Sequence, residues 1–251
     1  MPFLHVLAIF GAGIAAGTIN AVVGSGTLIT FPVLLGFGYA PVVANVSNTI
    51  GLVPGNASGA VGYRHELQGQ SRRRVLPLAL ASLAGGIIGA ALLLSLPASA
   101  FKAIVPVFIG IALVLIVLNP WISRRLAARR TEPRGDGGAL TVIGVGISGL
   151  YGGYFGAAQG ILVLAILGLG LDEELQRINA LKVVLVGLVN FVSGAIFVFA
   201  AHVAWAPAGL IAGGSIIGGV LGSRYGRRLP PPALRAIIVI VGVVAIVHLL
   251  A

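Results

Sequence analysis

The chain has 251 residues, of which 58% are hydrophobic and only 9% are charged, and its mean hydropathy is +1.07. A soluble globular domain needs more charge on its surface, so this composition excludes that class and predicts a helical membrane protein. The net charge of +10 comes from basic residues in short loops, which argues against a nucleic-acid partner, and the lack of Cys excludes disulfides and thiol chemistry.

Apolar runs between Gly, Pro and polar residues predict helical segments in two halves. In chain order these are 3–23, 27–38, 42–63, 75–96 and 101–119, then 140–155, 158–170, 174–200, 207–223 and 233–250. Between the halves, 120–139 is a polar loop with five Arg residues. The predicted domains are an N-terminal transmembrane repeat (1–119), a basic cytoplasmic linker (120–139) and a C-terminal transmembrane repeat (140–251).

A glycine-rich stretch near the start, Gly17 to Gly38, returns in altered form 132 residues later, from Gly149 to Gly170. The aligned glycines are Gly17, Gly24, Gly36 and Gly38 in the first copy and Gly149, Gly156, Gly168 and Gly170 in the second. Each copy places a break rich in small residues between two short apolar runs. A duplicated pair of broken hydrophobic segments points to a secondary transporter and to its binding site.

The basic loops predict how the two repeats are oriented. Loop 64–74 has four Arg and its counterpart 201–206 has no Lys or Arg, whereas loop 97–100 has none and its counterpart carries Arg224, Arg227 and Arg228. Because basic loops stay in the cytoplasm, the repeats are predicted to be inverted, with both termini on the non-cytoplasmic side. The fold class is thus an all-α polytopic membrane protein of two inverted five-segment repeats. Each repeat opens with a broken or re-entrant half-helix pair; a re-entrant hairpin is favoured over a fully spanning broken helix.

Charged residues within the spans indicate the sign of the cargo. All six acidic residues lie in loops or at helix starts, which disfavours transport of sodium or divalent cations. Lys182 lies well inside the predicted helix 174–200, near the bilayer midplane. A lone cation at that depth is a functional candidate, and the alternative is a Lys that snorkels or pairs with backbone carbonyls.

Polar stripes on two matching helices extend this site. Asn45 aligns with Asn179, Asn48 with Lys182, and Asn56 with Asn190, each set on one helical face. The stripes predict one shared cavity, with interhelical hydrogen bonding as the alternative. The half-helices that open at Gly24–Thr27 and Gly156–Gln159 would present N–H groups to an anion, although close helix packing also explains many glycines.

The candidate substrate-binding residues combine the breaks and the stripes. They are Gly24, Ser25, Gly26, Thr27, Asn45, Asn48, Thr49, Gln159, Asn179 and Lys182, with Asn20, Tyr151 and Tyr154 as weaker candidates. No catalytic residue, cofactor or metal is predicted, because the four His residues are scattered near segment ends.

Three segments of the sequence resemble a known family of membrane proteins. The pattern GxxxGxINxxVGSGTLITFPVLLGFG at Gly13–Gly38, the segment Ala44–Thr49 and the second copy followed by Asn179–Lys182 resemble the sulfite exporter TauE/SafE family of bacterial membrane transporters. The resemblance implies export of sulfite or small organosulfonate anions across the inner membrane. The second break reads GAAQG where the first reads GSGT, which predicts an asymmetric site.

Three functions are compatible with these residues. The leading hypothesis is a secondary transporter of a small sulfur-containing anion that works by alternating access. A channel for anions or small solutes is the second, and an intramembrane serine hydrolase that uses Ser25 with His202 or His248 is the third. The expected partners are the anion and the lipid bilayer; the identity of the anion, the direction of flux, the coupling ion and a homodimer stay open.

Overall fold

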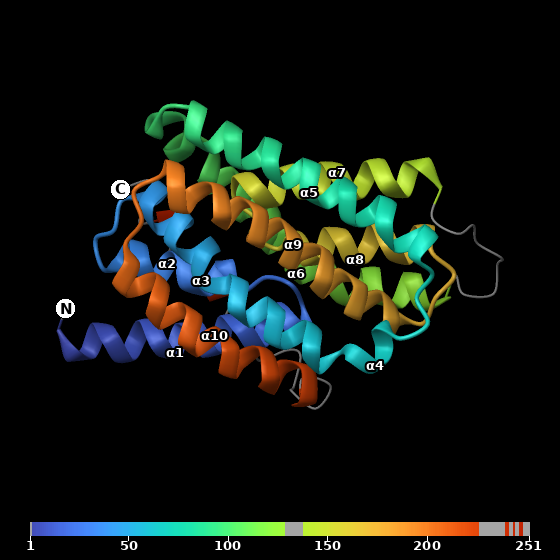
Figure 1. Ribbon diagram of the computed structural model, residues 1–251. Helices are drawn as coiled ribbons and strands as arrows, with labels where there is room; N and C mark the ends of the chain where they lie inside the picture. The colour runs from blue at the N-terminus through green and yellow to red at the C-terminus, as the bar shows by residue number, and fades with distance from the viewer. Residues whose placement is uncertain (1, 129–137, 226–238, 241–242, 244–245, 248–251) are drawn as a thin grey trace.

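The computed structural model describes residues 2–128, 138–225, 239–240, 243 and 246–247, and these residues form helices and no strand (Figure 1). The helices are α1 (Phe3–Val22), α2 (Thr27–Gly36), α3 (Pro41–Gly62), α4 (Arg64–Leu67), α5 (Arg72–Ser95), α6 (Ala98–Ala128), α7 (Ala139–Tyr154), α8 (Gln159–Gly170), α9 (Leu175–Ala200) and α10 (Trp205–Tyr225). The predicted all-helical class is confirmed. The predicted segment 233–250 and much of the linker lie outside the described residues.

Five of the described helices, α1, α5, α6, α9 and α10, are long and apolar enough to cross a membrane. Large apolar side chains cover the outside of the molecule, as at Leu140 (85% exposed) and Phe199 (91% exposed). An apolar surface of this kind suits lipid and not water. The chain is therefore a membrane protein, as its composition predicts.

Helix α6 differs from the prediction, because it continues beyond 119 to Ala128 and takes up the first part of the predicted linker. Pro120 lies inside the helix. It removes one N–H donor, but the residues that follow are apolar or good helix formers, so the helix continues past it. Arg124 Nε donates back to the Pro120 carbonyl over 3.3 Å.

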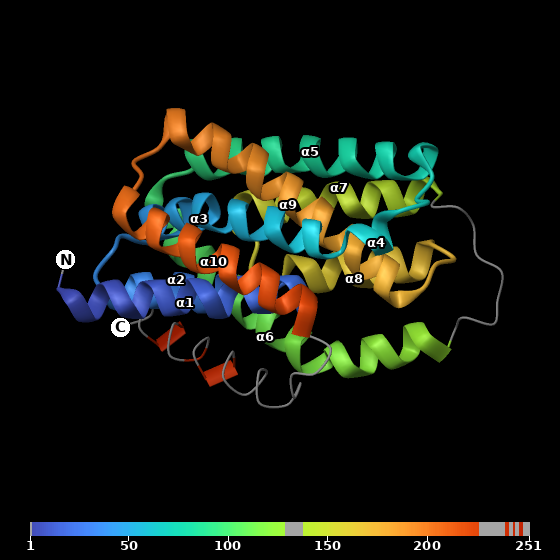
Figure 2. The same cartoon turned by 60° about the horizontal axis from the view of Figure 1, so that its bottom comes forward.

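The short segments of each half fold back as hairpins (Figure 2). In the first hairpin the rings of His5, at the start of α1, and Phe37, just after α2, stack with centroids 4.1 Å apart. In the second, a methyl group added at Gly170 would lie 2.0 Å from Thr141 Oγ1, so the end of α8 lies against the start of α7. Each half-helix thus returns to the end of the molecule at which its hairpin begins.

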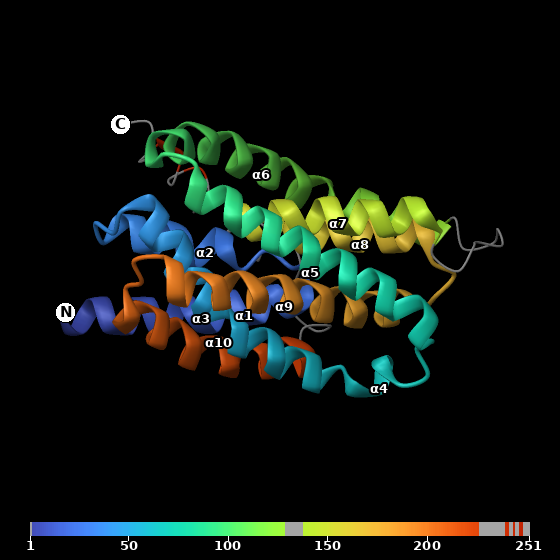
Figure 3. The same ribbon diagram turned by 45° about the horizontal axis from the view of Figure 1, so that its top comes forward.

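The hairpins are held by backbone contacts between the two halves (Figure 3): α1 packs against α10, and α7 packs against α5. A methyl group added at Gly17 would lie 2.4 Å from the Ser215 carbonyl oxygen. One added at Gly153 would lie 2.3 Å from the Gly86 carbonyl oxygen. Apolar lipid gives little driving force for helices to associate, so small residues that allow close backbone contact dominate such interfaces.

The two hairpins differ by one helical turn. Gly149 of α7 packs against Ser82 of α5, and in the other hairpin the equivalent contact is that of Gly13 of α1 with Ile211 of α10. The sequence alignment predicts Gly149 as the counterpart of Gly17. In the packing of the helices, however, the counterpart of Gly17 is Gly153. At the breaks that alignment does hold, since Gly24 and Gly156 both have positive φ, +84° and +76°. The reason is that α1 continues five residues beyond Gly17, to Val22, whereas α7 ends one residue after Gly153.

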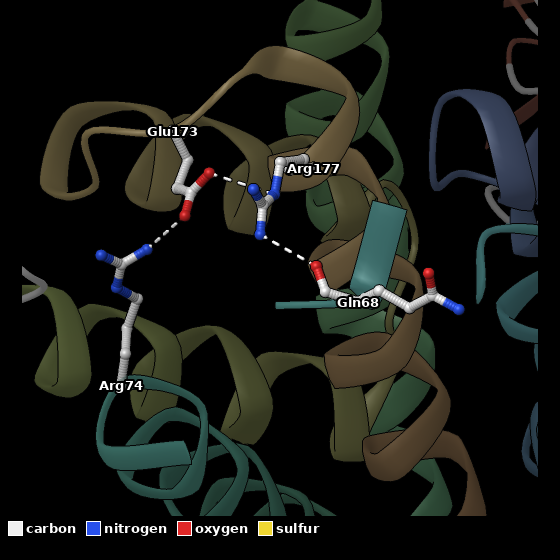
Figure 4. Close-up of polar contacts among 4 residues, drawn as sticks. All are labelled: Gln68, Arg74, Glu173 and Arg177. Carbon is white, nitrogen blue, oxygen red and sulfur yellow. Dashed lines mark hydrogen bonds and ion pairs between the residues drawn. The ribbon is translucent and has the colours of Figure 1, made fainter. Parts of the chain in front are cut away.

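An ionic cluster joins the connections at one end of the bundle (Figure 4). Glu173 accepts from Arg74, at the start of α5, over 2.6 Å and contacts Arg177, in α9, over 3.2 Å. Arg177 also donates to the Gln68 carbonyl, just after α4, over 3.1 Å. One carboxylate therefore links the α8–α9 connection of the second half to α5 of the first.

Substitution of Gly17 tests the close packing of α1 on α10. Gly17→Ala pushes a methyl group into backbone atoms that cannot yield, and we expect a loss of about 1–3 kcal/mol of stability. Gly11→Ala, on the same helix with no atom within 4 Å, is the control, and we expect it to be neutral or slightly stabilising. Thermal unfolding in detergent measures both, and equal melting temperatures would contradict the packing.

Substitution of Glu173 tests the ionic cluster. Glu173→Gln removes the charge that two guanidinium groups share, and we expect a loss of about 2 kcal/mol, the usual size for hydrogen bonds to charged groups. The control is Glu174→Gln, one residue along and exposed, which should change the melting temperature little. An equal drop in melting temperature in both variants would show that the ionic cluster stabilises the fold no more than an exposed surface charge does.

Candidate functional site

The two chain breaks meet inside the bundle. Gly160 N–H, in the first turn of α8, donates to the Gly24 carbonyl over 3.0 Å. A methyl group added at Gly24 would lie 2.4 Å from the Gly160 Cα, and the positive φ of Gly24 also favours glycine. From this junction α2 and α8 run toward opposite ends of the molecule (Figure 1). The half-helix N-termini that the sequence predicts are therefore brought together.

Side chains of α3 bond to the first break and to the start of α2. Asn48 Nδ2 donates to Thr27 Oγ1 over 3.3 Å, and Asn48 Oδ1 accepts from the Thr30 hydroxyl. Asn56 Oδ1 accepts from Asn20 Nδ2 over 2.5 Å, while Asn20 Oδ1 lies 3.5 Å from the Gly26 N–H. The polar stripe of α3 therefore faces the break, and Asn20 connects the two.

Asn45 and Asn179 have equivalent roles in the two halves. Asn45 Nδ2 donates to the Tyr154 carbonyl, the last residue of α7, over 3.0 Å. Asn179 Nδ2 donates to the Ala21 carbonyl, near the end of α1, over 3.3 Å. Carbonyls in the last turn of a helix have no partner within that helix, and in an apolar interior they need one. Each polar helix thus caps the broken helix of the opposite half.

Lys182 lies at the same junction and is 1% exposed. Its Nζ donates to the carbonyls of Asn20 over 3.3 Å and Ala21 over 3.4 Å, at the negative end of the α1 dipole. Its alkyl chain passes Gly160, where an added methyl group would lie 3.0 Å from Lys182 Cδ. The ammonium group therefore pairs with backbone carbonyls, and these account for two of its three N–H donors.

Several buried polar atoms near the junction have no hydrogen-bond partner within the described part of the chain. They are Ser25 Oγ, Asn45 Oδ1, Asn56 Nδ2 and Tyr154 Oη. Ser25 is 1% exposed and stands two residues before the start of α2. Buried polar groups are normally hydrogen-bonded. The Ser25 hydroxyl and the Asn56 amide group are therefore donors available to a ligand beside the first break.

The second break offers less to an anion than the first. Gln159 and Gly160 open α8, and the Gly160 N–H is already bonded to the Gly24 carbonyl. The Gln159 amide lies against Gly152, where an added methyl group would be 2.3 Å away. Ala158 has a φ of +57°, a conformation uncommon outside glycine. The asymmetry predicted from GAAQG and GSGT therefore has a structural counterpart.

An aromatic cluster adjoins the junction on the side of α6. Phe31 of α2 and Phe155 of the second break meet edge to face with centroids 5.1 Å apart. Phe101 of α6 lies 6.4 Å from Phe31 and 6.0 Å from Phe155 by the same measure. These rings are almost fully buried and form an apolar wall beside the junction.

All ten predicted substrate-binding residues are buried, but they do not act alike. Thr49 donates to the Asn45 carbonyl of its own helix over 2.9 Å, so its hydroxyl serves α3 rather than the break. The prediction missed Thr30, and it placed Asn20 among the weaker candidates although Asn20 connects α1, α2 and α3. The position of Asn56 on the same face of α3 was a signal that sequence analysis could have used.

Ser25 and His202 do not form a hydrogen-bonded pair within the described part of the chain. The serine hydroxyl makes no hydrogen bond to any described residue, and His202 lies exposed in the α9–α10 connection. His248 lies outside the described residues. Within those residues, no group of three or more His, Asp or Glu side chains gathers as a metal site would require.

Broken apolar helices that meet inside a helical bundle are the architecture of secondary transporters. The family model described as Sulfite exporter TauE/SafE matches residues 9–249, and the chain belongs to this family. The resemblance found from the sequence is thereby confirmed.

Relatives of similar length carry transporter names. The chain is 30% identical to the probable membrane transporter protein ORF9 of Sinorhizobium sp., over 98% of this chain and 93% of that protein. It is 26% identical to the probable membrane transporter protein YfcA of Escherichia coli, over 96% and 88%. A probable membrane transporter protein of Haemophilus influenzae is also 26% identical, over 94% and 91%. No solved structure matches the chain.

The contact between the breaks can be tested at Gly160. Gly160→Ala forces a methyl group to within 2.4 Å of the Gly24 backbone, so we expect the junction to open and stability to fall. The expected loss is about 1–3 kcal/mol, as for other overpacked sites. Gly36→Ala, at the far end of α2 with no atom within 4 Å, is the control. Melting temperatures compare the two, and an unchanged Gly160→Ala protein would refute the contact.

Proposed function

We propose that this protein is a secondary transporter that exports a small sulfur-containing anion, sulfite or an organosulfonate, across the inner membrane. The observation that carries the proposal is the junction itself. It combines the start of α2, the unpartnered hydroxyl of Ser25 and the ammonium group of Lys182, all buried within the bundle. Helix N-termini and cations bind oxyanions, and no carboxylate lies within the described spanning helices to oppose one.

Alternating access between the two halves is the mechanism that we propose. The cross-packing of α1 on α10 and of α7 on α5, and the matching roles of Asn45 and Asn179, support two repeats related by inversion. Substrate sites of inverted-repeat transporters lie at the interface of the repeats, near the membrane midplane. Movement of one hairpin relative to the other at the junction would open the site to one side at a time.

The orientation follows from the basic residues. Arg64 begins α4 and Arg72 begins α5, and both helix starts lie at the same end of the molecule as the start of α9 (Figure 1). The start of α1 and the α9–α10 connection lie at the opposite end (Figure 1). Under the positive-inside rule we place the basic end in the cytoplasm and the N-terminus outside it. The C-terminal segment lies outside the described residues.

Lys182→Gln tests the role of the cation. The amide retains N–H donors for the α1 carbonyls, but the positive charge is lost. We expect sulfite flux to fall about 100-fold, which corresponds to about 3 kcal/mol for hydrogen bonds to a charged group. Flux of radiolabelled sulfite is measured in proteoliposomes that contain the purified protein, with thiosulfate, sulfate and small sulfonates as competitors.

The control for this test is a second charge-removing variant on the same helix. Arg177→Gln removes one positive charge five residues earlier on α9, at the ionic cluster, and should leave flux largely unchanged. Normal flux in a folded Lys182→Gln protein would show that Lys182 only caps α1, and would refute its place in the anion site. Flux that neither saturates nor shows counter-transport would replace the transporter with a channel.

A further inference from the structure

A second candidate binding site lies where the last turn of α3 meets the last turn of α10. A pocket of about 380 Å³ is lined there by Ser58, Val61, Gly62, Arg64, His65, Val220, Ser223 and Arg224. It lies beyond the ends of the polar stripe and includes none of the residues of the junction. Its lining combines basic groups, hydroxyl groups and exposed apolar side chains, a combination that the transport site does not explain.

The packing of the two helices brings the charges together. A methyl group added at Gly62 would lie 2.0 Å from Ser223 Oγ, so α3 and α10 are in contact at this point. Arg64 lies two residues after Gly62 and Arg224 directly after Ser223, and both line the pocket. No Asp or Glu side chain is among the described residues of the lining. The close contact of the two helices therefore brings two arginine side chains to one pocket.

The apolar part of the pocket faces outward. Val61 is 62% exposed and Val220 is 40% exposed, and they continue the lipid-facing surface of α3 and α10. The hydroxyls of Ser58 and Ser223 donate to backbone carbonyls, at 3.0 Å from Ile216 and 3.1 Å from Val220 respectively. A ligand in this pocket would contact the arginines at its polar end and the apolar side chains of Val61 and Val220 along its length.

We infer that this pocket binds the phosphate headgroup of an anionic phospholipid, with an acyl chain along the outer face of Val61 and Val220. Basic pockets between transmembrane helices at the cytoplasmic side bind such headgroups. A soluble anion would use the arginines but gain nothing from the apolar rim, which is why a lipid fits better. The inference rests on the proposed orientation of the protein, but not on the proposed cargo or on the mechanism of transport.

Native mass spectrometry of the full-length protein, extracted in mild detergent after reconstitution with phosphatidylglycerol and phosphatidylcholine, tests this site. We expect the wild-type protein to retain phosphatidylglycerol in preference to phosphatidylcholine. Each basic side chain near an anionic headgroup contributes about five-fold in affinity, so Arg64→Gln with Arg224→Gln should lower retention about 25-fold. The single variants are measured separately to show that each Arg contributes.

The control pair is Arg72→Gln with Arg73→Gln, exposed residues at the start of α5 that do not line the pocket. This pair removes the same charge near the same end and should retain phosphatidylglycerol as the wild type does. Equal losses in both pairs, or no headgroup preference in the wild type, would overturn the proposal. Binding of inorganic phosphate as tight as that of the lipid, at the same two arginines, would assign the pocket to a soluble anion instead.

Discussion

The contact between Gly24 and Gly160 is the constraint on which the rest of the structure depends. It brings two interrupted helices together backbone to backbone in an environment without bulk water. There, each helix end must find partners for its free N–H and C=O groups within the protein. The asparagines of α3 and α9 and the ammonium group of Lys182 supply those partners. The polar residues of the core are therefore a consequence of breaking the helices.

The same groups connect stability with function. A half-helix end that is fully satisfied by the protein can bind nothing else, and the second break comes close to this state. The first break differs, because the Ser25 hydroxyl and the side-chain amide nitrogen of Asn56 have no partner among the described residues. Lys182 has both a structural and a proposed functional role, since it caps α1 and also brings positive charge to the junction. An anion bound there would compete with the α1 carbonyls for one ammonium group.

Many helix boundaries could be predicted from the sequence, because in this chain apolar runs end at glycine, proline or charged residues. Two helices are exceptions: α4 forms within the predicted loop 64–74, and α6 continues past Pro120 because Trp121 and Ile122 extend the apolar run. The burial of Asn48 and Lys182 agrees with the polar stripes that helical spacing predicted on α3 and α9. The hydrogen-bond partners of these side chains could not be predicted, because periodicity places a residue on one face of a helix and does not identify what that face contacts.

The sequence by itself determined the membrane class, the family, the two breaks and the presence of a positive charge within α9. These features depend on composition and on local spacing. Only the tertiary structure decided that Asn20 connects three helices, that Lys182 bonds to the end of α1, and that the hairpins differ by one turn. Each of these depends on how far one helix slides along another. Glycine-rich surfaces permit several such registers, and contacts between residues distant in the chain select one.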